Sequence, residues 1–158
     1  MCGICGEIRL DGAGASRDTI GRMNDVLTRR GPDDEGIYND RQEAFRHRRL
    51  SINDLSEKSH QPFIDRQHDL ELVFNGTIYY YRELRADLGQ QGHQFSSEGD
   101  SEVILKAWAQ GGEQCFDHLI GMFAFFIYDR KRELSFMARD RLGIKPVYYA
   151  PSPVRILF

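Results

Sequence analysis

Residues 121–128, with the sequence GMFAFFIY, place the strongest constraint on how this chain can fold. Apolar side chains occupy both the odd and the even positions of this segment, so a β-strand here would be apolar on both faces. Such a strand must be covered on both sides. Residues 70–74, LELVF, form a second segment rich in aliphatic and aromatic side chains. We therefore expect buried strands that lie between other layers.

Three other segments have the apolar spacing that is typical of helices. We predict a helix over residues 16–28, which the turn-forming segment 30–34 ends and a loop follows. A second helix is predicted over residues 79–88. A third follows Asp100-Ser101, where Asp100 is the expected N-cap, and it ends at Gly111-Gly112. Helices outside and short strands inside indicate a layered α+β fold rather than βαβ alternation.

Length and composition narrow the class of protein. With 158 residues, 41% of them hydrophobic, the chain can bury the core of one domain spanning residues 1–158. A net charge of −3 gives no excess positive charge for phosphates, so nucleic acid is not an expected partner. Glu7 and Arg9 exclude a secretory signal, and no run approaches the roughly 20 apolar residues of a membrane span, so the cytoplasm is the expected location.

Residues 154–158 end as a strand cut short would, and we expect a truncated piece of a longer protein.

Cys2 combines two reactive groups in one residue once Met1 has been removed, which a small second residue favours. Its thiol would then lie beside a free α-amine. An α-amine ordinarily has a pKa of about 7.7–8.0, so near neutral pH it can take the thiol proton and later return a proton to a leaving group. Position alone leaves a second reading open, in which Cys2 is an ordinary cysteine near the chain start.

Cys2 and Cys5 also form a C-x-x-C pair, which raises a redox or zinc hypothesis. Nothing precedes the pair that could be the strand of a thioredoxin-type motif. If residues 2–10 form a strand, positions three apart point to opposite faces, so Cys5 faces the core. Cys115 has no His or Cys at metal-ligand spacing and is expected to be a small buried apolar residue. The histidines show no metal-ligand spacing either, and no metal site is predicted.

Several motifs, in order and at consistent spacing from Cys2 to Tyr149, resemble the class II glutamine amidotransferases, in particular their asparagine-synthetase branch. The motifs are Cys2-Gly3-Ile4, RGPDDEG at 30–36, HRRLSI at 47–52, Asn75-Gly76 followed by Ile78-Tyr79 and Tyr81-Arg82-Glu83-Leu84, and RDRLGIKP at 139–146. This resemblance implies a four-layer αββα sandwich of the N-terminal nucleophile hydrolase type. It further implies that a cysteine thiolate attacks the side-chain amide of L-glutamine, forms a thioester, releases ammonia and is freed by water.

The same resemblance implies roles for individual residues. Arg49 would bind the substrate α-carboxylate with its forked guanidinium, although it could instead be a surface or core-covering arginine. Asn75 and Gly76 would supply the oxyanion donors, although Asn-Gly is also a common hairpin signal. Asp100 would bind the α-ammonium group, although it could simply cap its helix. The remaining expected substrate-binding positions are Leu50, Ile52 and Thr77.

Two residues depart from the family pattern. Thr77 stands where the family usually has glutamate, and Tyr80 stands where it usually has asparagine. The first change removes a carboxylate expected near the substrate ammonium, which predicts weaker glutamine binding or a shifted substrate preference. Both changes also leave open a non-enzymatic reading, in which a degenerate amidotransferase fold serves as a scaffold or interaction module.

No pyrophosphatase loop or P-loop occurs in the sequence, so no nucleotide cofactor is expected in this chain. The resemblance places ATP and magnesium in an ammonia-accepting synthetase domain that would follow this region and that the chain lacks. By itself, the domain is expected to act as a glutaminase. Arg139-Asp140-Arg141 with Lys145 is interpreted as a structural ion network or an interdomain contact, and Trp108 as a core residue.

Overall fold

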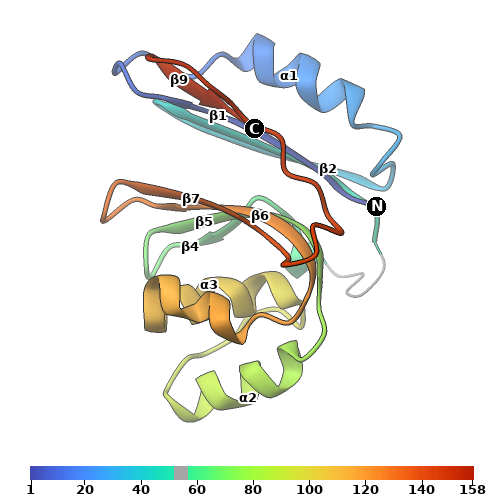
Figure 1. The fold of residues 1–158 in the computed structure, drawn as a ribbon, viewed down its shortest axis with the longest axis vertical. Coiled ribbons are helices and arrows are strands. Elements are labelled where there is room, and N and C mark those ends of the chain that lie inside the picture. Colours follow the sequence, from blue (N-terminus) through green and yellow to red (C-terminus); the bar gives the residue numbers. More distant parts are fainter. Residues whose placement is uncertain (52–56) are drawn as a thin grey trace.

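Figure 1 shows two β-sheets stacked face to face, with one helix above the upper sheet and two helices below the lower one. The computed structural model describes residues 1–51 and 57–158. In this part of the chain, the helices are α1 (Arg17–Val26), α2 (Tyr81–Gln90) and α3 (Asp100–Gly111), with short 3-10 helices η1 (Glu57–Ser59) and η2 (Gly112–His118). The strands are β1 (Gly3–Arg9), β2 (Asp34–Asp40), β3 (Glu43–Arg49), β4 (Phe63–Asp65), β5 (Leu70–Ile78), β6 (Gly121–Asp129), β7 (Leu134–Arg139), β8 (Ala150–Pro151) and β9 (Arg155–Leu157).

The two sheets are antiparallel wherever strands pair in the described residues. The upper sheet has the order β2-β3-β1-β9-β8, and the lower sheet has the order β4-β5-β6-β7. β1 lies at the centre of the upper sheet, with Gly3 opposite Arg48 and Ile8 opposite Glu43 of β3. β5 and β6 form the longest pairing, which runs from Leu70 opposite Asp129 to Ile78 opposite Gly121.

β6 is covered on both faces, as predicted. Phe123, Phe125 and Ile127 belong to the core between the lower sheet and helices α2 and α3. Phe126 points the other way and packs against Phe45 of the upper sheet, at a ring-centroid distance of 5.3 Å. The period of two along a strand therefore sends alternate side chains of one segment into two different cores. A third, smaller core lies between the upper sheet and α1. The predicted αββα order of layers is confirmed.

The helices fall close to the predicted segments. The Ser16 hydroxyl accepts a hydrogen bond from the backbone N–H of Thr19 and caps α1. α2 begins two residues later than predicted, and α3 ends at Gly111-Gly112 as predicted, with Gly112 at φ +55°. The prediction that Asp100 is the N-cap of α3 is wrong, because Gly99 holds that position and Asp100 is the first helical residue.

Strands β2 and β3 form where the sequence predicted a loop. β3 has the charged sequence EAFRHRR, yet nearly all of it is buried. Its charges are compensated by contacts from other elements: Arg46 donates to the carbonyl oxygen of Tyr38 at 3.1 Å, and Arg130 lies 3.0 Å from Glu43. Buried charged groups are tolerated when they are paired in this way.

None of the helices in the described residues is long and apolar enough to cross a membrane. Trp108 is buried in the core below the lower sheet, as predicted, and its indole N–H donates to Asp129 at 3.1 Å. Asp140 binds backbone N–H groups rather than the neighbouring cations. In the part of the chain that the structure describes, no ion pair joins it to Arg139, Arg141 or Lys145.

Candidate active site

A pocket of about 180 Å³ opens beside the start of β1. Every predicted site residue within the described ranges lines it, whereas Ile52 lies outside them. This volume, with Met1 still in the lining, falls below the roughly 300–1,000 Å³ of pockets that hold drug-sized ligands, so the pocket suits a small ligand. The predicted residues that line it are Cys2, Arg49, Leu50, Asn75, Gly76, Thr77 and Asp100.

Cys2 is half-buried and its thiol faces the chain that leaves β3. The backbone N–H of Leu50 lies 3.4 Å from Cys2 Sγ and donates to it, and the carbonyl oxygen of Leu50 lies 3.7 Å from the same sulfur. Arg30 donates to the Cys2 carbonyl oxygen at 3.2 Å, which fixes the backbone of the first residues. These contacts with Leu50 and Arg30 hold the sulfur and the backbone of Cys2 at the edge of the pocket.

Asn75 and Gly76 lie inside β5 and form no hairpin turn, so the hairpin reading of this dipeptide is wrong. They pair with Ala124 and Phe123 of β6. A Cβ atom on Gly76 would lie 2.3 Å from the carbonyl oxygen of Met122, so the close approach of β6 requires glycine here. Asn75 is 6% exposed and borders the pocket, where its amide is held by the strand rather than by a mobile loop.

Arg49 ends β3 and is 9% exposed. Its carbonyl oxygen accepts the backbone N–H of Asp33 at 3.0 Å, and the Asp33 carboxylate in turn accepts the backbone N–H of Ser51 at 2.8 Å. These bonds tie the RGPD turn to the segment that carries Arg49 and Leu50. The turn therefore helps to place Leu50 against Cys2 and Arg49 at the pocket that Cys2 lines.

Asp100 lies on the far side of the pocket, at the first turn of α3. Its carboxylate accepts the backbone N–H of Ile78 at 3.0 Å, so it connects the end of β5 to the helix. Burial raises the pKa of Asp100 to about 6, although the N–H donors of Ile78, Asp100 and Ser101 act in the opposite direction. At pH 7 the carboxylate is mostly ionised and can receive an ammonium group.

Several pocket residues were not predicted as site residues. His47 is buried, its Nε2 lies 3.2 Å from the Phe74 carbonyl oxygen, and burial lowers its pKa to about 4, so it is neutral at pH 7. Gln61 accepts the Phe74 N–H at 2.6 Å and donates to Ser101 at 3.2 Å. Lys145 is 6% exposed and comes from the RLGIKP motif. His47 belongs to the HRRLSI motif and Lys145 to the RDRLGIKP motif, whereas no sequence pattern indicated Gln61.

The other two cysteines lie in the core and are free thiols. Burial raises the pKa of Cys5 to about 12 and that of Cys115 to about 12. Cys5 lies in the extended strand β1 and packs with Ile20 in the core against α1, whereas Cys2 lines the pocket, so the pair does not have the geometry of a C-x-x-C redox motif. Cys115 is a small buried apolar residue, as predicted.

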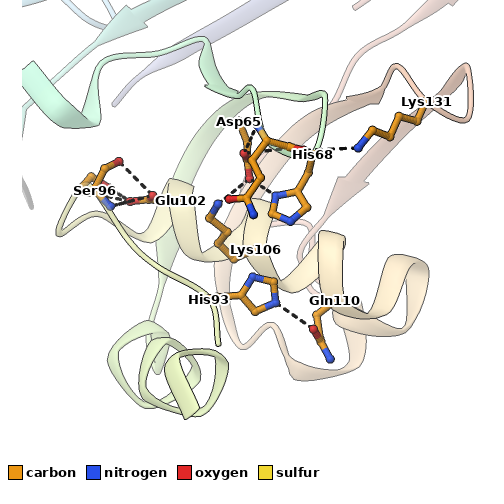
Figure 2. Close-up of polar contacts among 10 residues, drawn as sticks. Asp65, His68, His93, Ser96, Glu102, Lys106, Gln110 and Lys131 are labelled. Atoms are coloured by element: carbon orange, nitrogen blue, oxygen red, sulfur yellow. Dashed lines mark hydrogen bonds and ion pairs between the residues drawn. The ribbon is translucent and has the colours of Figure 1, made fainter. Parts of the chain in front are cut away.

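A polar cluster under the lower sheet fixes α3, whose first turn carries Asp100. Figure 2 shows Lys106 of this helix reaching Asp65, where Nζ lies 2.8 Å from the carboxylate, with His68 Nδ1 2.7 Å from the same group. In the same view, Glu102 lies against the chain that leads into the helix. Its carboxylate accepts the backbone N–H and the hydroxyl of both Ser96 and Ser97, at 2.7 to 3.0 Å.

Glu102→Gln should lower the free energy of unfolding by about 1–2 kcal/mol. The amide would place an NH₂ group, which donates, where a carboxylate oxygen now accepts from the N–H and hydroxyl groups of Ser96 and Ser97. Urea unfolding measures the change. Glu98→Gln is the matched control: its side chain is 87% exposed and should change stability by less than about 0.5 kcal/mol. Equal losses in the two variants would contradict the assigned role of Glu102.

Known proteins resemble this chain in sequence and in fold. A family model described as a glutamine amidotransferase domain matches residues 1–158. The chain is 38% identical to asparagine synthetase (glutamine-hydrolyzing) 3 of Bacillus subtilis, covering 100% of this chain and 26% of that protein. It is 42% identical to a putative asparagine synthetase (glutamine-hydrolyzing) 2 of Methanocaldococcus jannaschii, covering 94% of this chain and 32% of that protein.

Among solved structures, glutamine phosphoribosylpyrophosphate amidotransferase of B. subtilis aligns with a TM-score of 0.61 at 20% identity, covering 98% of this chain and 35% of that one. The αββα sandwich is therefore the fold of that amidotransferase. The chain belongs to the glutamine amidotransferase domain family, in its asparagine-synthetase branch. It spans about a quarter to a third of the length of these curated relatives.

Proposed function

We propose that this domain hydrolyses the side-chain amide of L-glutamine with Cys2 as the nucleophile. The observation that carries the proposal is the convergence of Cys2, Arg49, Asn75 and Asp100, from four separate segments, on one small pocket. The pocket offers a cation for an α-carboxylate and an anion for an α-ammonium group. It also provides a thiol and an amide donor for the reacting carbon.

After removal of Met1, the α-amine of Cys2 takes the thiol proton, and the thiolate attacks the glutamine side-chain carbon. The donors of Asn75 and Gly76 stabilise the oxyanion of the tetrahedral intermediate. The C–N bond then breaks, the amine returns the proton to the leaving nitrogen, and ammonia departs. Water attacks the thioester, the thiol is regenerated and glutamate is released.

We also propose that the ammonia serves a synthetase domain following residue 158, which would bind ATP and magnesium itself. The named relatives are glutamine-hydrolysing asparagine synthetases and are three to four times longer than the matched region, which supports this arrangement. We propose that the molecule that accepts this ammonia is a carboxylate such as aspartate. The cytoplasmic location stays a prediction.

Glutamate release from glutamine tests the proposed activity. Intact-mass measurement first establishes that Met1 has been removed. The processed protein should then release glutamate, Cys2→Ala should not, and Cys115→Ala, which alters a buried thiol in the core, should retain the activity. Activity that survives Cys2→Ala would exclude the mechanism, and a processed protein without activity would favour the scaffold reading.

Thr77→Glu should lower the KM for glutamine up to about fivefold, because a second carboxylate would share the substrate ammonium with Asp100. An ion pair in a partly exposed setting contributes up to about 1 kcal/mol, which corresponds to that factor. Thr77 is half-buried and borders the pocket. Steady-state kinetics measures the effect, and Thr77→Gln, of similar size but uncharged, should leave KM near the wild-type value. An unchanged KM in Thr77→Glu would refute the prediction.

A further inference from the structure

Lys145 is a buried cation in the pocket for which the proposed reaction has no assigned role. The segment that carries it follows β7 and is held by Asp140, whose carboxylate accepts the backbone N–H groups of Ile144 at 2.8 Å and Lys145 at 2.9 Å. The same carboxylate accepts the N–H of Phe123 in β6 at 3.2 Å. Lys145 is therefore fixed relative to the strand that pairs with Asn75 and Gly76.

Within the residues that the structure describes, the ammonium group of Lys145 has no acidic partner. Its Nζ donates to the sulfur of Met1 at 3.0 Å, and no carboxylate in residues 1–51 or 57–158 forms an ion pair with it. Burying an ammonium group without a counter-charge is costly, and structural lysines avoid it by pairing or by reaching solvent. At 6% exposure, Lys145 reaches little solvent, and no carboxylate of the described residues pairs with it.

The contact with Met1 limits how far Lys145 lies from the reacting amine. Five bonds separate the sulfur of Met1 from the nitrogen of Cys2, and their lengths allow at most about 6 Å. With the 3.0 Å contact, Lys145 Nζ lies within about 9 Å of the Cys2 nitrogen. That nitrogen becomes the free α-amine when Met1 is removed.

The other charged groups around Cys2 have mixed signs. Arg30 reaches the Cys2 carbonyl oxygen, Arg49 lines the pocket from the end of β3, and Asp100 lines it from α3. His47 is neutral at pH 7 because burial lowers its pKa to about 4. Three cations, Lys145 included, thus face one carboxylate in the described part of the site.

We propose that Lys145 is a positioning residue whose charge keeps the α-amine of Cys2 unprotonated, so that the amine can act as the general base. The inference rests on the proposed function and deepens it. A positive charge within about 9 Å disfavours a second one on the amine, by roughly 0.3 pH units if water screens the pair and about 1.4 if the effective dielectric constant is near 20.

The test is the pH dependence of kcat/KM for glutamine, whose acidic limb reports the base of the free enzyme together with Asp100, which titrates near pH 6 in every variant compared. With Met1 removed, Lys145→Met should move this limb to higher pH by about 0.3 to 1.4 units. Lys145→Arg keeps the charge and should keep the wild-type limb. Lys131→Met is the matched control: it removes an exposed lysine, in the turn between β6 and β7, whose Nζ contacts the Gln67 carbonyl oxygen, and its limb should not move (Figure 2).

An acidic limb that stays in place in Lys145→Met, while kcat/KM falls equally at every pH, would overturn the inference. So would a rise in KM alone, since Lys145 would then contact the substrate. A direct measurement covers poorly active variants: with 15N-labelled cysteine, the pH titration of the Cys2 amine resonance should move in Lys145→Met and not in Lys131→Met. Because this titration needs no turnover, it separates failure of this inference from failure of the proposed activity.

Discussion

Asn75→Ala should reduce kcat for glutamine hydrolysis by about 10²–10³-fold while KM changes little. The expectation follows from its place inside β5, where the paired strand β6 holds the amide before the substrate arrives. A donor fixed in advance stabilises the oxyanion without reorganisation, and losing one such donor typically costs about 2.7–4 kcal/mol in the transition state. The ground-state amide gains little from it, so substrate binding should persist.

Gly76→Ala separates this effect from damage to the strand. An added Cβ would meet the Met122 carbonyl oxygen at 2.3 Å and would force β5 and β6 apart. That variant should therefore lose stability as well as activity, whereas Asn75→Ala should lose activity with a much smaller change in urea midpoint. If Asn75→Ala retained wild-type kcat, the oxyanion would have to be stabilised elsewhere and the assignment would fail.

The layered fold was predictable because its evidence is local. The two-sided apolar pattern of residues 121–128 requires cover on both faces, and β6 has it. The helices followed from apolar spacing and from stop signals such as Gly111-Gly112, where the positive φ of Gly112 is one that L-residues rarely adopt. The predictions that failed depended on partners distant in the sequence.

β3 shows why a loop was predicted in place of a strand. Its glutamate, arginines and histidine have no apolar alternation, and they are buried only because partners from other elements compensate them. Arg130 follows β6 and lies 87 residues beyond Glu43, the residue that it pairs with. No window of sequence around β3 contains that information. Propensity was overridden by tertiary contacts.

The candidate site was predictable in part. Resemblance of motifs identified Cys2, Arg49, Asn75 and Asp100, and the fold brings them into one pocket. Gln61 was missed because its contribution is a pair of hydrogen bonds, to Phe74 and Ser101, that exists only once β5 and α3 are packed. Local sequence predicted Asp100 as a helix cap, yet its carboxylate accepts the backbone N–H of Ile78, a residue of β5 that is 22 positions earlier in the chain.

Asp100→Asn should stabilise the fold near neutral pH. Burial holds the pKa of Asp100 at about 6 in the folded protein, against an ordinary value of 3.8. The folded state thus binds this proton more tightly than the unfolded state, and stability falls as pH rises through this window. The difference between the two pKa values corresponds to a loss of folding stability of about 3 kcal/mol. This loss is absent below about pH 4 and fully present above about pH 6.

Urea unfolding at pH 3 and at pH 7 measures this change. The stability of Asp100→Asn relative to wild type should rise by about 3 kcal/mol between the two pH values, whatever constant cost the buried amide adds. Asp18→Asn, which alters a carboxylate of α1 that is 82% exposed, should show no such pH dependence. A relative stability that stays level with pH would mean that burial does not raise the pKa of Asp100 in the folded protein.

The same variant should bind glutamine worse, and a gain in stability together with weaker glutamine binding would identify Asp100 as a binding residue. Removing the carboxylate leaves the substrate ammonium without its partner, a loss of about 2–5 kcal/mol for a buried charge pair, so KM should rise at least tenfold. In the wild-type enzyme, KM should likewise climb as pH falls below about 6. A purely structural carboxylate would give the stability gain alone. A binding residue is expected to destabilise the free protein and to gain its favourable contact only when the substrate binds.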